Sequence, residues 1–571
     1  MEGHRVTEIN SLIRDQARIS GDICTSSKMG TEISKDGREK VLVDAKSEYI
    51  DEVLQQEVHD SDEDHESDGY DECDGEFGEL EKLAHTIDPK DYVDQYPFEN
   101  LIFEGGGAKG IAYPGGLRAL EEVGIMKKIK RFAGTSVGSI TATMAALGYK
   151  STEIREVMST DFSKYYDARF GKFSFIPNLL WYLGWQPLLT LYDYIGEIVE
   201  KKLGDKDATF DQLYKKLGKE LCIVATNLND MEETYFHPKT TPKMPIRKAV
   251  RMSISLPGIM QPIKHTDFGV ESMYVDGGVL INYPIECYDG WWLSMKKEDS
   301  FFERLQPLEK LPFIMDRKNR FARDGTQSSK SLGFILYSED EIESFKSIFE
   351  SRRRKTVQFP DTPLGRKATQ KMENERKLNK EHKCVRTAVS KFLKILQKYN
   401  LDKDEFISRD ELENAIRSEE LSHCDKKRLF GKNVTVDEVM AKLDKDKNGK
   451  ISYEELVSFI EETGISVVHR RLGFGRQQVD TFLSLLQTLY NTMSLNIVRI
   501  SVSAADVSRT VGLNSHYIGT LTFDYTKEDA DFVGQESYNT TLAFLKNFVA
   551  KLKMEEKARA PFISTKNELD G

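Results

Sequence analysis

Residues 101–138 read LIFEGGGAKGIAYPGGLRALEEVGIMKKIKRFAGTSVG, and the order of features in this stretch decides the fold. The apolar run Leu101–Phe103 is typical of a short buried strand. It is followed at 105–107 by glycines, which favour a turn because glycine has no Cβ. Apolar residues then recur at helical spacing as far as Gly124, and a glycine at that point is typical of a helix end.

The same order repeats directly afterwards. Lys130–Ala133 predicts a second strand, residues 134–138 form a second glycine-rich turn, and Ile140–Leu147 predicts a second helix. Two successive strand–turn–helix units predict an α/β fold with a mainly parallel central sheet flanked by helices. The same patterns predict further strands at Leu221–Thr226, Met273–Val275, Leu332–Leu336, Ile497–Val502 and Ile518–Phe523, and helices at Val479–Tyr490 and Thr541–Lys551.

The composition of the first 95 residues differs from that of the rest. They hold 27 acidic and 10 basic residues, a net charge of −17, whereas the whole chain of 571 residues carries −12. Such a stretch cannot bury enough apolar surface to offset chain entropy, so we predict mostly disorder and an ordered start near Tyr96. The six cysteines form no CxxC pair, which predicts a reduced intracellular protein. The sequence predicts neither a secretory signal nor a membrane-spanning helix.

The first motif with candidate chemistry is Gly134-x-Ser136-x-Gly138. A serine hydroxyl can project from a sharp strand-to-helix turn when the flanking residues are glycines, because a Cβ would clash there. The helix that follows points its N-terminal dipole at the serine and favours negative charge beside it. The motif predicts a nucleophilic serine, although an ordinary tight turn can carry the same five residues.

The second motif is the glycine loop Gly105-Gly106-Gly107-x-Lys109-Gly110. Successive glycines let backbone N–H groups point into one concavity, which suits a carbonyl oxygen that becomes negative. These glycines also match the GxGxxG pattern of dinucleotide-binding sites. That interpretation requires an acidic residue at the end of the next strand, where this chain has Gly134-Thr135-Ser136 instead.

The third motif is Asp276-Gly277-Gly278, which follows the expected strand Met273–Val275. An acidic side chain at a strand end can be directed at a neighbouring site. A plain strand-end turn can have the same sequence. The motif therefore indicates a functional site only in combination with the other two motifs.

Taken in order, the three motifs resemble the patatin-like phospholipase family, in which a glycine-rich oxyanion loop precedes GxSxG and then DG[GA]. Arg251–Pro262 is similar to the family's Ser-x-Ser-x-Pro run, and Asn282 and Pro284 also match its pattern. Glu104 departs from the residues that many relatives carry there.

The resemblance implies a Ser–Asp dyad without a catalytic histidine. Ser136 would attack an ester carbonyl, and Asp276 would accept its proton and later activate water. The N–H groups of Gly106 and Gly107 would form the oxyanion hole, and Lys109 would anchor the loop. Because a carboxylate of ordinary pKa is a weak base for a hydroxyl, a dry site that raises this pKa is expected.

A separate motif predicts calcium binding. Residues 444–455 match an EF-hand loop throughout, with the oxygen ligands that calcium requires at Asp444, Asp446, Asn448, the Lys450 carbonyl and Glu455. An imperfect loop precedes it, with ligands at Asn400, Asp402, Asp404, the Phe406 carbonyl and Glu411. Glu405 stands where this first loop should have glycine, so we predict weak binding or a supporting role for it.

The motifs together predict the following order: an acidic region 1–95, the first part of a catalytic domain 96–365, an all-α EF-hand pair inserted at 366–465, an α/β segment 466–555 that completes the catalytic domain, and a tail 556–571. The resemblance implies a lipid acyl hydrolase of phospholipase or lysophospholipase type, and the inserted EF-hand pair predicts that it responds to calcium. Calcium would be a regulatory ion, and the dyad would need no cofactor.

Two other functions stay open from the sequence. An α/β-hydrolase with a Ser-Asp-His triad would use His237, His265, His469 or His516. A protein that kept the fold but lost catalysis would be a calcium-responsive membrane or scaffold protein.

Expected partners follow from the same motifs. We predict a lipid substrate, a cytoplasmic location with peripheral membrane contact, and no nucleic-acid partner; protein partners are not predicted. The uncharged aromatic run Phe173–Tyr192 and the basic run Arg352–Lys355 favour a lipid surface, although buried packing and a solvated surface explain them as well.

Overall fold

The computed structural model describes residues 75–160, 164, 175–267, 269–322, 328–338, 357–399, 404–431, 435–463, 479–502 and 504–569. Several sequence predictions fall outside these residues and stay predictions. They concern the acidic region before residue 75, the basic run Arg352–Lys355, and the first-loop ligands Asn400 and Asp402.

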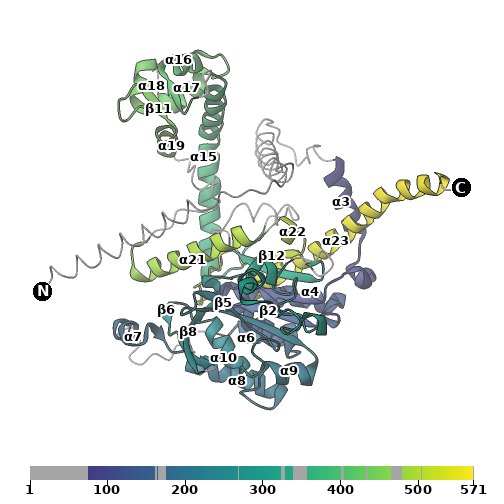
Figure 1. Cartoon of the computed structure of the whole chain (residues 1–571). Coiled ribbons are helices and arrows are strands. Elements are labelled where there is room, and N and C mark those ends of the chain that lie inside the picture. Colours follow the sequence, from purple (N-terminus) through teal and green to yellow (C-terminus); the bar gives the residue numbers. More distant parts are fainter. Residues whose placement is uncertain are drawn as a thin grey trace, which may run out of the picture. The chain divides into compact units, whose positions relative to one another are not determined.

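An eight-stranded sheet forms the centre of the α/β part (Figure 1). Its strand order is β12-β9-β1-β2-β4-β8-β7, and β5 pairs with β4 beside this path. Neighbours from β12 to β4 are parallel, whereas β5, β7 and β8 pair antiparallel. The strands are β1 Asn100–Phe103, β2 Arg131–Thr135, β4 Glu220–Asn227, β5 Glu232–Phe236, β7 Ile263–Asp267, β8 Val270–Asp276, β9 Ser331–Tyr337 and β12 Thr510–Asn514. The predicted α/β class with a mainly parallel sheet is confirmed.

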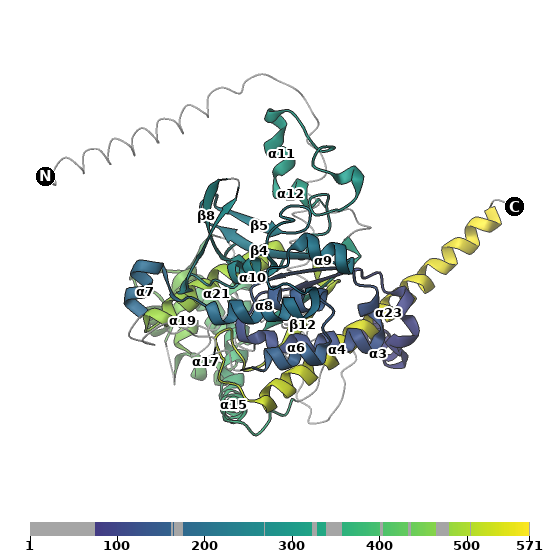
Figure 2. The same cartoon turned by 90° about the horizontal axis from the view of Figure 1, so that it is seen from below.

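Alternate residues of the central strands enter different cores, as the two-residue period of a strand requires. Leu101 and Phe103 belong to the larger core, whereas Ile102 between them belongs to a second one. The helices over the larger core include α4 (Tyr113–Val123), α5 (Val137–Ala146), α6 (Ser151–Met158), α8 (Leu189–Leu203), α9 (Phe210–Leu217), α10 (Ile246–Ser253) and α23 (Lys527–Leu569). Figure 2 shows α6, α4 and α23 side by side. The second core is closed by the chain that follows β8, through Ile281, Tyr283 and Ile285.

Order begins earlier than the sequence predicts. Helix α3 (Gly75–Thr86) contacts α23, and Ala84 and Ile87 are buried against the larger core. The predicted start near Tyr96 is therefore wrong. Apolar residues at helical spacing give α3 one face that can pack, which offsets the acidic composition of the segment.

Two predicted strands near the C-terminus are also wrong. Helix α21 (Phe482–Ser501) continues through the β-branched run at 497–501, and Ile518–Phe523 forms turns rather than a strand. The strand that joins the sheet beside β9 is β12, which was not predicted. Short β-branched runs cannot be distinguished from helix segments by periodicity alone, and here the helix that starts at Phe482 extends through such a run.

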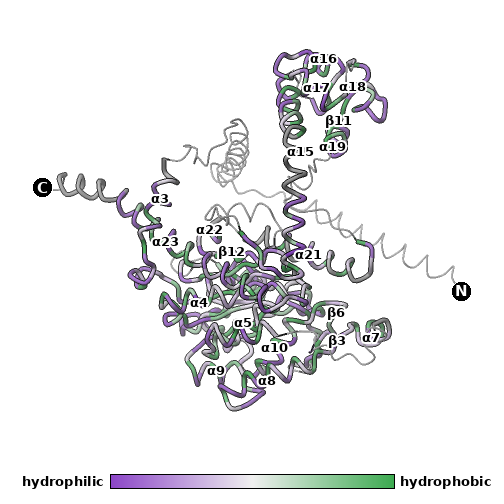
Figure 3. The backbone as a smooth tube through the Cα atoms, turned by 180° about the vertical axis from the view of Figure 1, so that it is seen from behind, coloured by the Kyte–Doolittle hydropathy of each residue, from purple (hydrophilic) through white to green (hydrophobic). Residues whose placement is uncertain are grey.

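The predicted EF-hand pair forms a helical unit with its own core. It comprises the end of α15 (Pro363–Tyr399), α16 (Arg409–Arg417), α17 (His423–Phe430), α18 (Val436–Leu443) and α19 (Tyr453–Glu462), and its short strands β10 (Phe406–Ser408) and β11 (Lys450–Ser452) pair antiparallel. Figure 3 shows hydrophobic stretches in its helices and hydrophilic loops. Leu364 near the start of α15 packs on the α/β core, whereas Phe392 is buried in the helical unit.

The remaining elements are short. They are α7 (Phe175–Tyr182), β3 (Gly184–Gln186), β6 (Gly258–Met260), α11 (Leu311–Met315), α12 (Arg317–Arg320) and α22 (Ala504–Val507). β3 and β6 pair in parallel as a separate two-stranded sheet. Within the described part of the chain, no helix is both long and apolar enough to cross a bilayer.

Candidate active site

The pairing register of β4 brings Ser136 and Asp276 together. Residues 225–227 of β4 pair with both β5 and β8, so these two strands must lie on opposite edges of β4. Residues 223–224 pair with both β5 and β2, so β2 and β8 share the other edge. Thr135 lies opposite Val224 and Asp276 lies opposite Ala225. The carboxyl ends of β2 and β8 therefore meet end to end.

Ser136 occupies a strained turn between β2 and α5. Its φ of 51° and ψ of −128° are a conformation that side-chain-bearing residues rarely adopt. A Cβ at Gly134 would collide with the carbonyl of Gly138, and a Cβ at Gly138 would collide with the carbonyls of Phe103 and Glu104. Both glycines of the motif are thus required by close backbone contacts, and the turn projects the serine side chain out of the strand.

The serine hydroxyl and the carboxylate form a buried pair. Ser136 Oγ donates to Asp276 Oδ2 across 2.7 Å, and Asp276 is only 1% exposed. Burial raises the pKa of the Asp276 carboxyl to about 6, although hydrogen bonds from Ser136, the Gly278 amide and Tyr490 oppose the rise. A carboxylate with this pKa is a stronger base than an exposed one and is still ionised at neutral pH.

The glycine loop is held close to the serine by backbone hydrogen bonds on both sides. The Gly105 amide donates to the Asn282 carbonyl at 3.0 Å, and the Ala108 amide donates to the Thr520 carbonyl at 2.9 Å. Gly107 has a φ of 55°, and a Cβ there would collide with the Thr520 carbonyl. Among the described residues, the amides of Gly106 and Gly107 have no such carbonyl partner outside their own helical turn, so they can donate to a bound group.

Several residues that shape the site were not assigned a role from the sequence. The buried Glu104 carboxylate accepts hydrogen bonds from Asn282 Nδ2 at 3.0 Å and from the Leu336 amide at 2.6 Å. The Ser136 amide donates to Ser253 Oγ at 2.9 Å. These contacts join segments more than 100 residues apart. The sequence motifs marked Asn282 and the Ser-x-Ser run around Ser253, but they did not indicate these contacts.

Lys109, Gly110 and Gly277 also lie at closely packed positions around the proposed site. Lys109 is 4% exposed and lies in the short helical turn η2 (Gly107–Ala112) that follows the glycines. A Cβ at Gly110 would collide with Val137, and a Cβ at Gly277 would collide with the Val224 carbonyl. Gly110 therefore allows the loop to pack closely on the start of α5, and Gly277 allows the end of β8 to pack closely on β4.

The described histidines do not form a triad with Ser136. His237 is buried and lies 3.4 Å from Glu220 Oε2, where burial lowers its pKa. His265 Nδ1 lies 2.8 Å from Lys248 Nζ, and His516 contacts the rings of Phe359 and Phe532. His469 lies outside the described residues. The hydroxyl of Ser136 is bonded to Asp276 and, within the described chain, to no histidine.

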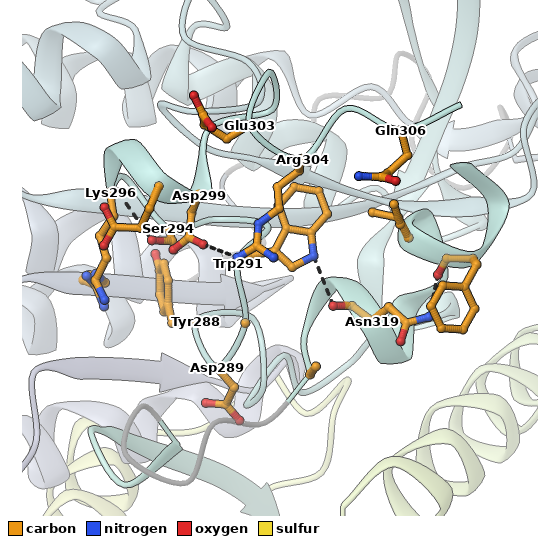
Figure 4. Close-up of a pocket in the computed structure, with 16 residues that line it drawn as sticks. Tyr288, Asp289, Trp291, Ser294, Lys296, Asp299, Glu303, Arg304, Gln306 and Asn319 are labelled. Atoms are coloured by element: carbon orange, nitrogen blue, oxygen red, sulfur yellow. Dashed lines mark hydrogen bonds and ion pairs between the residues drawn. The ribbon is translucent and has the colours of Figure 1, made fainter. Parts of the chain in front are cut away.

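A cavity of about 610 Å³ lies elsewhere, next to Trp291 and Arg304 (Figure 4). Arg131 lines it, and this residue starts β2, whereas Ser136 follows the end of that strand. The cavity therefore lies toward the opposite end of β2 and is not the site of the dyad. Its lining mixes acidic, basic and aromatic side chains, so its chemistry selects no single class of ligand.

The second EF-hand loop has the geometry of a cation site. Carboxylate oxygens of Asp444, Asp446 and Glu455 lie within 4.8 Å of one another, which matches ligands placed about 2.4 Å from one calcium ion. Gly449 has the expected left-handed φ of 82°, and the Asp444 carboxylate accepts from its amide at 2.9 Å. The oxygen donors therefore fit calcium. Lys450, whose carbonyl is the predicted fourth donor, lies in β11, and Asn448 Oδ1 accepts from its amide at 2.8 Å.

The first loop is arranged differently. Asp404 Oδ2 lies 3.3 Å from Lys450 Nζ of the second loop. Glu411 caps α16 through Ser408, as Glu455 caps α19 through Ser452 in the second loop. Glu405 is absent from the described residues with positive φ, so this loop avoids the strained turn that the sequence implied. Phe406 opens β10, which pairs with β11 of the second loop. The two loops are thus joined by a strand pair and an ion pair.

Comparison with known families decides the class of the α/β part. Residues 101–287 match the family model of patatin-like phospholipases. This segment is therefore similar to patatin-like phospholipases. Residues 390–461 match the model of an EF-hand domain pair. Both resemblances drawn from the sequence motifs are confirmed, and the chain combines a patatin-like domain with an EF-hand pair.

The patatin-like domain has relatives in viruses. It is 38% identical over 199 residues to an uncharacterized protein of Acanthamoeba polyphaga mimivirus, covering 34% of this chain and 63% of that protein. It is 30% identical over 198 residues to a probable lipid hydrolase of Invertebrate iridescent virus 6, covering 33% of this chain and 62% of the relative. The chain thus spans less than two thirds of each relative.

One of the solved structures that match is VipD from Legionella pneumophila. The match covers 78% of this chain and 66% of that chain at 16% identity, with a TM-score of 0.33.

Proposed function

We propose that this chain hydrolyses acyl esters of lipids with Ser136 as nucleophile and Asp276 as base, and that calcium at the EF-hand pair modulates the rate. One observation carries the catalytic part. The Ser136 hydroxyl donates across 2.7 Å to a buried carboxylate, from a strained turn that faces a glycine loop. The family match and the relative named as a probable lipid hydrolase support a lipid substrate.

The reaction follows from this pair in two steps. In the first, Ser136 Oγ attacks the ester carbonyl carbon while its proton passes to Asp276 Oδ2, and the proton then goes to the leaving alcohol. The C–O bond to the alcohol breaks, and the acyl group stays on Ser136. In the second step, Asp276 takes a proton from water, whose oxygen attacks the acyl carbon. The acid leaves and Ser136 regains its proton.

The amides of Gly106 and Gly107 would stabilise the oxyanion in both steps. They lie in a loop whose neighbouring amides are already bonded to Asn282 and Thr520, so the loop is ordered before substrate binds. Donors fixed in advance stabilise developing charge without a cost of reorganisation, and one such donor contributes about 3 kcal/mol to the barrier in serine hydrolases.

An exposed apolar surface suits peripheral contact with a lipid aggregate. In and after α7, Leu180, Trp181, Tyr182 and Leu183 are 69%, 75%, 62% and 52% exposed. Tryptophan and tyrosine favour the bilayer interface. β3 follows this segment and pairs with β6, whose Gly258 and Ile259 pack near Leu486 and Tyr490 beside the dyad. The exposed segment is thus connected through β3 and β6 to residues packed beside the proposed dyad.

Calcium control is proposed from the position of the EF-hand pair in the chain. The pair lies between β9 and β12, which are neighbours in the sheet, and it is followed by α21, which reaches the dyad through Tyr490. A change in the angle between EF-hand helices on calcium binding would act on the connection from β9 to the pair and on the connection from the pair to α21.

Hydrolysis by matched variants tests the catalytic proposal. Purified protein would be incubated with phospholipid, lysophospholipid and triacylglycerol dispersions, and the released acids measured by mass spectrometry. We expect wild type to release fatty acid from at least one class and Ser136→Ala to be at least about 10³-fold slower. The control Ser139→Ala changes a serine one turn later whose hydroxyl bonds the Ser136 carbonyl, and it should lose far less. Equal rates for wild type and Ser136→Ala would overturn the dyad.

Vesicle binding tests the membrane surface. We expect Trp181→Ala to lower co-sedimentation with phosphatidylcholine vesicles several-fold, since a partly inserted tryptophan is lost. Phe302→Ala is the matched control, because Phe302 is 88% exposed but outside this surface. Equal losses for the two variants would show that α7 is not the contact.

A further inference from the structure

Helix α21 brings a tyrosine hydroxyl to the proposed base. Tyr490 Oη donates to Asp276 Oδ1 at 3.3 Å, and the tyrosine is 9% exposed. Tyr490 comes from the segment after the EF-hand pair and is 214 positions from Asp276 in the chain. The patatin family match ends at residue 287, so this contact lies outside the matched part of the domain.

The tyrosine ring is fixed by packing on several elements. It belongs to a small core with Leu256 and Ile259, joined by Leu486 one turn earlier on α21. Leu486 lies over β6, where a Cβ at Gly258 would be 2.9 Å from its Cδ1. Gly278 makes room for the hydroxyl, because a Cβ there would collide with Tyr490 Oη. The last glycine of the Asp-Gly-Gly motif therefore serves Tyr490 as well as the turn.

The two oxygens of Asp276 have different partners. Oδ2 accepts from Ser136 at 2.7 Å, whereas Oδ1 accepts from the Gly278 amide at 2.7 Å and from Tyr490 at 3.3 Å. Two donors on Oδ1 hold the carboxylate plane and leave Oδ2 as the oxygen that can take the serine proton. A base held in this orientation needs no rotation before proton transfer.

We propose that Tyr490 is a positioning residue that orients the Asp276 carboxylate with Oδ2 toward Ser136. This inference rests on the proposed function of the dyad. It adds a residue from the segment after the EF-hand pair to the machinery of the patatin-like domain, although that residue does not touch the substrate.

The test is the pH dependence of kcat/KM for Tyr490→Phe, which removes the hydroxyl and keeps the ring. The hydroxyl stabilises the ionised carboxylate, so its loss makes protonation easier. We expect the acid limb of the profile to move to higher pH by about 0.5 unit, with kcat lowered several-fold and KM little changed. A variant that only loosened the fold would lower the amplitude at every pH and leave the limb in place.

Two controls separate positioning from packing. Leu486→Ala thins the same small core without removing the hydroxyl, and it should lower the melting temperature with the limb unmoved. Tyr517→Phe removes a hydroxyl that bonds another carboxylate, Asp529, at 2.6 Å, and it should also leave the limb in place.

The outcomes distinguish this inference from the function on which it rests. A wild-type profile for Tyr490→Phe, in a protein whose hydrolysis depends on Ser136, would overturn the positioning role alone. A wild-type protein without Ser136-dependent hydrolysis would overturn the proposed function, and the positioning role with it.

Discussion

The buried carboxylate of Asp276 sets the pH range in which the proposed dyad can work. It must be ionised to accept the serine proton, and burial raises its pKa to about 6, mainly through desolvation. The hydrogen bonds from Ser136, Gly278 and Tyr490 keep it from rising further. A base near this value balances basicity against the fraction that is ionised at neutral pH.

We therefore expect kcat/KM to fall tenfold per pH unit below about pH 6 and to be flat from pH 7 to 8, because the protonated carboxyl cannot act as a base. The rate would be measured with a soluble short-chain ester to avoid changes in the lipid surface. An acid limb near pH 4, the range of an ordinary aspartate, would contradict a desolvated base.

The same carboxyl affects stability in a predictable direction. Its pKa in the folded state lies above the ordinary value of 3.8 that an unfolded chain would show, so the contribution of this carboxyl to stability falls as pH rises between about 4 and 6. Asp276→Asn has no charge to bury. Its stability relative to wild type should rise by about 2 kcal/mol between pH 4.5 and pH 8. Urea unfolding at both pH values measures this, and an unchanged difference would contradict the burial effect.

The residues of the dyad could be predicted from the sequence, but their supports could not. Ser136 and Asp276 each have glycines within two positions that close backbone contacts require. The glycine spacing around each residue therefore marks it in the sequence. Glu104 and Tyr490 act through contacts with residues 178 and 214 positions away. A single side chain in a strand end or an amphipathic helix carries no local mark of such a contact.

Among the elements, the strands and helices around the glycine motifs were predicted well and those after the EF-hand pair less well. β1 and β4 have continuous apolar runs, which buried parallel strands favour. β12 contains Gly512 and ends in Asn514, so its sequence gives a weak strand signal, and its place is fixed by pairing with β9. Pairing with a distant strand overrides local propensity.

The second EF-hand loop allows a sharp test of calcium control. Glu455 supplies a carboxylate to the oxygen cluster and also caps α19 through Ser452. We expect Glu455→Ala to remove the difference between hydrolysis rates in calcium and in a chelator, because the ligand at loop position 12 is lost. Glu454→Ala removes a neighbouring exposed acid and should keep that difference. A wild-type calcium response in Glu455→Ala would contradict the role of this loop.

On the scale of the whole molecule, the sheet is built from segments on both sides of the EF-hand pair. β9 precedes the pair and β12 follows it, and α23 packs across α4 of the first segment. Val533, Leu545 and Val549 of α23 are fully buried in the larger core. The first segment alone would expose the apolar surface of α4 and its neighbours that α23 covers. It would also expose the edge of β9 that pairs with β12.

We therefore predict that a chain ended after residue 365 does not fold. It should be insoluble or lack a cooperative thermal transition by circular dichroism, because the helix α23 that covers α4 is missing. A chain ended after Lys557 keeps every buried residue of α23 through Ala550 and should melt as the full chain does. A cooperative transition in the shorter chain would show that residues 75–365 form a complete domain.

The most direct measurement is the site of covalent labelling by a fluorophosphonate, which reacts with activated serines. The dyad predicts one adduct, on the peptide that contains Ser136, formed much more slowly in Asp276→Asn at pH 7.5 because the base is lost. An adduct on a different serine, or an equal labelling rate in Asp276→Asn, would contradict the proposed Ser–Asp chemistry.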